Sequence, residues 1–176
     1  MKKTKLTKIC FLLIFFLSCF YSFSQIEEFT NNTHFQLSDN YDIQVIGVAK
    51  DGSKVIRITT IEKKIETAIN NAQRDAVAVC LFKGLPSMGY IESTPAICDE
   101  SELEKNQSFF DEFFFNYYKH NSIISYFDFI EIISTPSLSN LTKMKIKEGF
   151  KITIDVLVSY FDLREYLKSE GININN

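Results

Sequence analysis

The run at residues 150–160 constrains the fold more than any other part of the chain, because apolar and polar side chains largely alternate along it. Successive side chains of a β-strand point to opposite faces of a sheet, so this pattern predicts a strand with one buried face. The apolar set is Phe150, Ile152, Ile154, Val156 and Val158, and the polar set is Lys151, Thr153, Asp155 and Ser159. We expect the apolar set to meet the core and the polar set to meet solvent or a partner.

Turn residues join the neighbouring β-rich runs into two hairpins. Residues 143–147 precede the alternating run across Glu148-Gly149. Nearer the N-terminus, residues 43–50 and 54–60 are separated by Asp51-Gly52-Ser53. Asp-Gly between two such runs is a strong short-range hairpin signal.

Three segments are predicted to be helices. Thr59, with Glu62 three residues later, has the form of a capping box, which predicts a helix from there to Lys83. The segments 107–120 and 162–171 have helical periodicity and termination signals. In the first helix the apolar stripe is centred on Ala68, Ala72 and Ala76, whose small side chains let a helix lie close to a sheet.

A final β-rich run, residues 122–134, is apolar on both sides, as buried central strands are. Hairpins therefore outnumber crossovers in the predicted element order. The sequence predicts an α+β fold of two layers, with helices packed on one face of a largely antiparallel sheet of about five strands.

The N-terminus has the three parts of a secretory signal: a basic start, an apolar run from Ile9, and Ser22-Phe-Ser24 before Gln25. We expect residues 1–24 to be a signal peptide, 25–41 a loosely ordered or partly packed lead-in, and 42–176 a single domain. The apolar run is too short to cross a bilayer, which takes about 20 residues, so we expect no transmembrane span after its removal. The alternative is lipid attachment at Cys19. Either way the chain is expected to be exported, to the periplasm, the outer membrane or the medium.

The remaining chain has 15 basic and 22 acidic residues, or a net charge of −7. Nucleic acids and anionic membrane surfaces select clustered Lys and Arg, so neither is an expected partner. Two cysteines remain, Cys80 and Cys98. They form a disulfide in an oxidising compartment, or Cys80 is a buried thiol on a helix, and the sequence does not decide between these alternatives.

Candidate partner-binding residues lie on two predicted outer faces. The helix at 107–120 is rich in aromatic residues, most of which fall on its apolar sector, but Phe115 projects from the polar face and Tyr118 lies at the sector's edge. Lys151 and Asp155 lie on the open face of the alternating strand. The irregular segment 84–106 is a further place where binding residues are expected, since loops commonly carry function.

Catalysis is not expected. The histidines, His34 and His120, have no metal-ligand spacing, and the chain has no Gly-x-Ser-x-Gly elbow or phosphate-binding loop. The carboxylates at 99–104 lack the alternation of a calcium loop. We therefore expect no metal and no cofactor.

Three passages carry a resemblance to known proteins: Val45-Ile-Gly-Val48, the helix at 68–76, and the closing strand and helix from Gly149. In these the chain resembles the N-terminal-like domains of flagellar assembly protein T and related small outer-membrane lipoprotein modules of bacterial envelopes. The chain departs from that pattern where Asp51-Gly52-Ser53 and an extra strand separate the glycine-bearing strand from the helix. The resemblance implies a non-enzymatic assembly role. It assigns no functional residues to this chain.

The leading functional hypothesis is an exported, non-catalytic binding or assembly module for another envelope component. The alternative is a carrier of small apolar ligands, in which the twelve phenylalanines after residue 24 line a pocket. A hydrolase is the third hypothesis.

Overall fold

The computed structural model describes residues 34–115, 124–134 and 144–175. These residues belong to one compact unit, His34–Asn176. Five strands make up its sheet: β1 (Tyr41–Val48), β2 (Lys54–Glu62), β3 (Ile130–Ser134), β4 (Met144–Ile146) and β5 (Gly149–Val158). The helices are α2 (Ile65–Ala78), α3 (Ser101–Lys105), α4 (Gln107–Phe115) and α5 (Tyr160–Ser169), with a π-helical turn η2 (Val79–Lys83) and a 3-10 turn η3 (Tyr126–Phe129).

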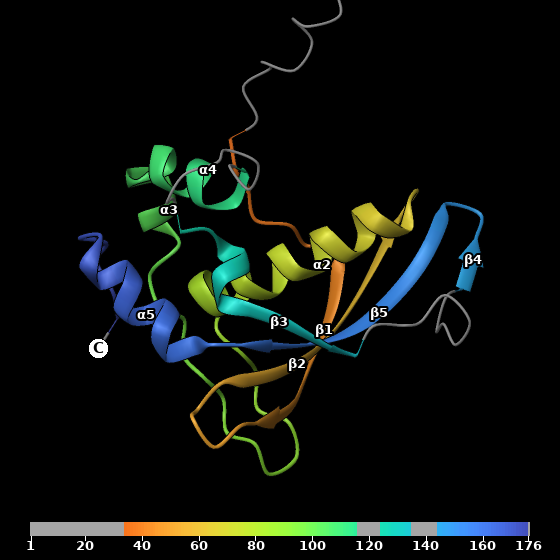
Figure 1. Cartoon of the computed structure of the whole chain (residues 1–176), viewed down its shortest axis with the longest axis horizontal. Coiled ribbons are helices and arrows are strands. Elements are labelled where there is room, and N and C mark those ends of the chain that lie inside the picture. The colour runs from red at the N-terminus through yellow and green to blue at the C-terminus, as the bar shows by residue number, and fades with distance from the viewer. Residues whose placement is uncertain (1–33, 116–123, 135–143, 176) are drawn as a thin grey trace, which may run out of the picture. The chain divides into compact units, whose positions relative to one another are not determined.

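The predicted α+β fold with a largely antiparallel sheet is confirmed. The strand order is β1-β2-β5-β3, and β4 pairs with the first residues of β5. Every pairing is antiparallel. Helix α2 packs against the sheet, and Figure 1 shows the helices on one side of the sheet or at its end. The two central strands, β2 and β5, are therefore covered by α2 on one face.

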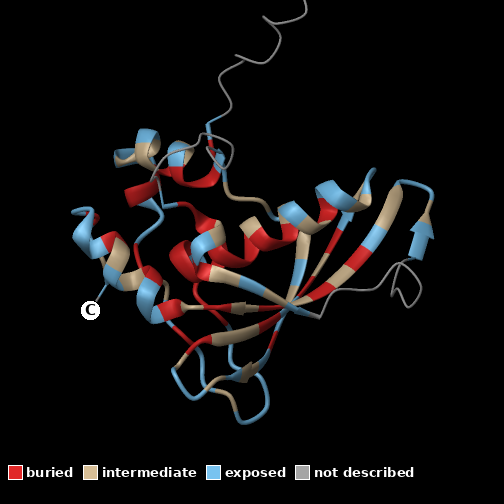
Figure 2. Cartoon of the chain, in the orientation of Figure 1, coloured by how far each residue is buried: buried red, intermediate tan, exposed pale blue. Residues whose placement is uncertain are grey.

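The alternating strand behaves as its sequence predicts. In β5 the side chains of Ile152, Ile154, Val156 and Val158 are buried, and the residues between them are exposed or half-buried. In the same hydrophobic cluster lie Ala68, Ala72 and Ala76 of α2, all fully buried, and Figure 2 shows buried stretches along this helix. Small side chains at successive turns let the helix axis approach the sheet closely.

The first helix begins later than the predicted capping box. Thr59 and Glu62 belong to β2, and α2 starts after Lys64, which makes no side-chain capping bond. The cause is tertiary, because β2 pairs with β1 as far as Thr60 and with β5 as far as Glu62. Those backbone bonds outweigh the single bond that a Thr59 cap would supply. The predicted end at Lys83 is confirmed, with the last turn π-helical.

The predicted buried central strand at 122–134 is wrong. Tyr126–Phe129 is a 3-10 turn, and only Ile130–Ser134 is a strand, at the edge of the sheet. Ser125 and Asp128 form a capping box, with the Ser125 N–H donating to Asp128 Oδ2 at 2.7 Å. The turn buries Tyr126 and Phe129, and an apolar run does not by itself distinguish such a turn from a buried strand.

The compact unit begins at His34, seven residues before the expected start near Tyr41. Phe35 is buried to 1 % exposure, and its ring stacks on Phe114 of α4 with 3.7 Å between centroids. Phe110 and Phe113 of α4 are also buried, as the aromatic sector predicts. Tyr117, Tyr118 and His120 lie outside the described residues. The segment 34–40 therefore belongs to the folded unit, because its Phe35 side chain is part of the hydrophobic core.

Candidate partner-binding site

The outer face of the sheet, opposite α2, is built from paired side chains of β2 and β5. Arg57 lies opposite Asp155, Thr59 opposite Thr153, and Ile61 opposite Lys151. Side chains that alternate with a buried set point away from the core. Lys151 and Asp155, the two strand residues predicted from sequence, therefore share this face.

Hydrogen bonds fix the centre of the outer face. Arg57 donates from Nε and Nη2 to the two carboxylate oxygens of Asp155, at 2.7 and 2.8 Å. The hydroxyls of Thr59 and Thr153 lie 2.7 Å apart in a second cross-strand bond. Bidentate arginine–carboxylate pairs are geometrically specific, so Asp155 orders the surface by holding Arg57 across the sheet.

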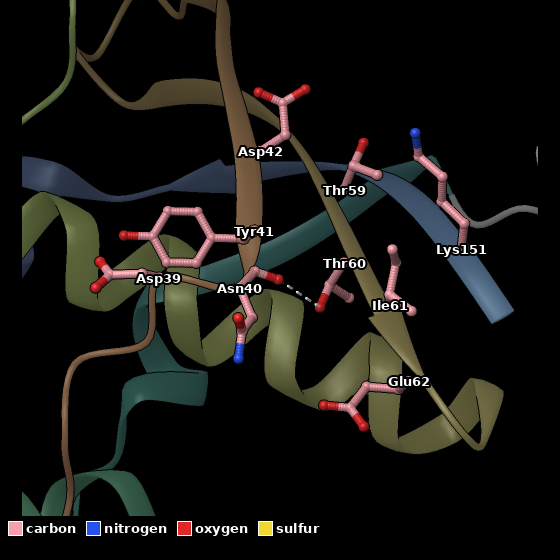
Figure 3. A pocket seen from close by; sticks show the side chains of 9 residues that line it. All are labelled: Asp39, Asn40, Tyr41, Asp42, Thr59, Thr60, Ile61, Glu62 and Lys151. Atoms are coloured by element: carbon pink, nitrogen blue, oxygen red, sulfur yellow. Dashed lines mark hydrogen bonds between the residues drawn. The ribbon is translucent and has the colours of Figure 1, made fainter. Parts of the chain in front are cut away.

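A hollow of about 490 Å³ lies where β1 begins and β2 ends. Figure 3 shows its lining, in which the side chains of Asp42, Thr59 and Lys151 point to the same side. The hollow is lined by Asp39, Asn40, Tyr41, Asp42, Thr59, Thr60, Ile61, Glu62 and Lys151. Thr60 Oγ1 donates to the carbonyl of Asn40 at 3.4 Å, which ties the segment before β1 to the end of β2.

Carboxylates outnumber cations in this hollow. Its lining holds Asp39, Asp42 and Glu62 against the single ammonium of Lys151. Asp39 binds Lys83 of η2 at 2.5 Å, and Glu62 accepts a bond from Asn71 of α2 at 2.7 Å, so both carboxylates are held on the α2 side of the sheet. Asp42 is exposed. Ile61 is 46 % exposed, so the outer-face part of the lining offers an apolar contact together with Asp42 and Lys151.

The predicted helix residues do not join this site. Phe115 ends the described part of α4 and is 40 % exposed, with its ring 6.1 Å from that of Phe35. Helix α4 lies on the α2 side of the sheet in Figure 1, whereas Lys151 lies on the outer face. Tyr118 lies outside the described residues.

Sequence reasoning missed the contribution of residues 39–42, which it placed in or beside a loose lead-in. It also assigned Ile61 and Glu62 to a helix rather than to the end of β2. The sequence signal that could have indicated this contribution is the pair of acidic residues on either side of the first residue of β1, Asp39 and Asp42. Their pairing with the end of β2 depends on the strand register, which links Asp42 to Thr59.

Cys80 and Cys98 are free thiols, so the disulfide alternative does not describe this structure. Both are buried, Cys80 in η2 and Cys98 in the segment between η2 and α3. The Ile97 N–H donates to the Cys80 carbonyl at 3.1 Å, and the Cys98 N–H to the Leu81 carbonyl at 2.8 Å. Burial raises the pKa of each thiol to about 12, which leaves neither suited to act as a nucleophile near neutral pH.

Among residues 34–115, 124–134 and 144–175 no group of three or more His, Cys, Asp or Glu side chains is arranged to hold a metal ion. His34 instead pairs with Asp111 at 2.8 Å on the surface. No helix in these same ranges is both long and apolar enough to cross a bilayer. His120 lies outside them.

The fold and this surface define a two-layer α+β domain with one sheet face open and an acidic hollow at the end of its central strands. No protein family model matches the chain, and no curated protein and no solved structure matches it either. The resemblance to the flagellar assembly protein T domains therefore stays a prediction.

Proposed function

We propose that the chain is an exported, non-catalytic module that binds a protein component of the cell envelope on the outer face of its sheet. The observation that carries the proposal is the hollow at the end of β2, where Asp42, Lys151 and the exposed Ile61 meet on an ordered surface. Fixed polar groups around an apolar contact are typical of protein-binding surfaces. The secretory-signal pattern at the N-terminus supports the proposed export.

The charge balance favours a partner with a basic segment. On the outer face the lining presents the exposed carboxylate of Asp42, and the chain after residue 24 carries 15 basic against 22 acidic residues. Complementary charge raises association rates and discriminates against acidic partners. A Lys or Arg side chain of the partner would meet Asp42, while its aliphatic part would cover Ile61.

The carrier alternative gains no comparable support. The aromatic side chains that would line its pocket pack on one another: Phe110 lies edge-on to Phe82 at 5.0 Å, and Phe114 stacks on Phe35. The hollow described above is open and mixed in polarity, rather than an enclosed apolar cavity of the kind that holds small ligands.

The test is a crosslinked affinity purification of the tagged full chain from envelope fractions, with Asp42→Lys compared against wild type. We expect wild type to recover one envelope protein in near-equal amount, and the variant to recover about tenfold less, because a like charge now faces the basic segment. Glu170→Lys, which makes the same charge change at the exposed end of α5, is the matched control and should recover as much as wild type. Equal recovery with Asp42→Lys would show that the hollow is not the binding surface.

A further inference from the structure

Residues 84–98, between η2 and α3, form a small hairpin that the proposed function does not use. Leu85 and Thr94 exchange backbone bonds of 2.8 and 2.9 Å, and Met88 and Ile91 exchange two bonds of 3.0 Å. The second exchange closes a two-residue turn whose first residue, Gly89, has a φ of +61°. A positive φ at that position, which glycine readily supplies, is shared by the tight type I′ and type II′ turns that join hairpin strands. Tyr90 is the second residue of this turn.

The base of the hairpin is held firmly. Leu85 and Thr94 are buried, and Gly84 lies so close to the returning chain that a Cβ there would be 2.6 Å from the Thr94 carbonyl oxygen. The backbone bonds of Ile97 and Cys98 to Cys80 and Leu81 of η2 continue this attachment. Tyr160 donates its hydroxyl to the Pro95 carbonyl at 2.8 Å. These three hydrogen bonds and the burial of Leu85 and Thr94 therefore hold the base of the hairpin against the rest of the domain.

The tip projects away from this base. Tyr90 is fully exposed, and Met88 is 40 % exposed, while Ile91 packs against the core. Beyond the chain neighbours, nothing lies within 4 Å of the position that a Cβ of Gly89 would take. An aromatic side chain on a tight turn binds at a small entropic cost, because its backbone is already fixed and it has few rotatable bonds.

We infer that the tip formed by Met88, Gly89 and Tyr90 inserts into an apolar pocket on a protein partner. Glu92 is the only charged residue at positions 84–98, so the hairpin offers no lysine or arginine to anionic lipid headgroups. Peripheral membrane segments normally combine apolar side chains with such cations. The composition therefore favours a protein pocket, with a cation of the partner near Glu92.

This surface is separate from the hollow on the outer face of the sheet. Lys54, the first residue of β2, places its Nζ 5.5 Å from the ring centre of Tyr160, which also binds the base of the hairpin. The hollow is lined by the last four residues of the same nine-residue strand. The two surfaces thus lie toward opposite ends of β2 and can be tested with separate variants.

The experiment places a photocrosslinking amino acid at position 90 of the full chain, in the cells that produce it, and at exposed position 67 on α2 for comparison. We expect one discrete protein adduct from position 90 and none of that mass from position 67. Added wild-type chain should compete for this adduct, and the double variant Met88→Ser, Tyr90→Ser should compete at least about tenfold less well. Ile124→Ser, which truncates a similarly exposed apolar side chain elsewhere, should compete like wild type.

The double variant should keep the melting temperature of wild type, since neither side chain is buried, so a folding defect does not account for lost competition. Absence of an adduct, or equal competition by the double variant, would overturn the inference. An adduct that adds the mass of the chain itself would overturn it in favour of self-association. Tyr90-dependent sedimentation with vesicles of phosphatidylethanolamine and phosphatidylglycerol would overturn it in favour of a membrane surface. None of these outcomes depends on Asp42, so failure here leaves the proposed function open to its own test.

Discussion

At the scale of single residues, burial determines the chemistry of the two described cysteines. The thiolate is the reactive form of cysteine, and an apolar surrounding disfavours that charge. Desolvation is the first cause of the raised pKa of both Cys80 and Cys98, and the nearby Glu102 and Asp99 raise that of Cys98 further. The cysteines therefore act as small apolar core residues.

In a chain whose Cys10 and Cys19 are replaced by serine, we expect a disulfide-exchange reagent at pH 8 to label Cys80 and Cys98 at least about 100-fold more slowly in the folded state than in guanidinium chloride, where the thiol pKa returns to about 8.5. Absorbance of the released product measures both rates. Rapid labelling of the folded chain would contradict the burial. A chain whose Cys80 and Cys98 remain unlabelled even when unfolded would contain the disulfide instead.

At the scale of elements, one carboxylate attaches residues 34–40 to α4. Asp111 accepts the Phe35 N–H at 2.5 Å and a bond from Gln107 at 2.9 Å, and it pairs with His34. Partial burial alone would raise the pKa of Asp111, but these donors together hold the pKa below its usual range. The attachment places the Phe35 ring on Phe114.

Asp111→Asn is expected to lower the free energy of unfolding at pH 7 by about 1–2 kcal/mol, because it removes hydrogen bonds to a charged acceptor. Since the folded pKa is depressed, the wild-type contribution is full above the unfolded pKa of about 3.9 and is lost as pH falls through the folded value. The difference between the two proteins should therefore shrink below pH 4. Urea unfolding from pH 3 to 7 measures it, with exposed Glu112→Gln as the matched control; a constant difference at every pH would contradict the argument.

At the scale of the whole molecule, the core extends further toward the N-terminus than its strands do. Phe35 precedes β1 but belongs to the same hydrophobic cluster as Ile56, Ile154 and Phe114. The boundary of the folded unit is therefore set by a side chain in a segment without regular secondary structure.

A chain beginning at Tyr41 is accordingly expected to be less stable than one beginning at His34 by about 3–5 kcal/mol, the usual cost of removing a buried phenylalanine side chain. Calorimetry or urea unfolding of the two truncated chains gives this difference. Phe35→Ala in the longer chain should reproduce most of it. Equal stability of the two chains would show that the unit starts at β1.

The local sequence pattern predicted those elements whose side chains follow the period of a single type of secondary structure. The alternation in β5, the Asp51-Gly52 turn and the alanine stripe of α2 each predict their element, because side-chain direction follows directly from the period of the backbone. Of the candidate residues, Lys151 and Asp155 could be placed on one outer face for the same reason.

Tertiary structure decided what a local pattern leaves open. Whether Thr59 to Glu62 caps a helix or extends β2 depends on the strands at either side, and whether residues 126–129 form a strand or a turn depends on where their side chains find a core. Strand pairing brings Asp42 of β1 and Lys151 of β5 to the end of β2, where all three strands contribute to the lining of the hollow. The sequence by itself therefore determined the class of fold and the face of its clearest strand. The register of the sheet decided which distant residues meet, because backbone pairing between strands is not encoded in the neighbours of any one residue.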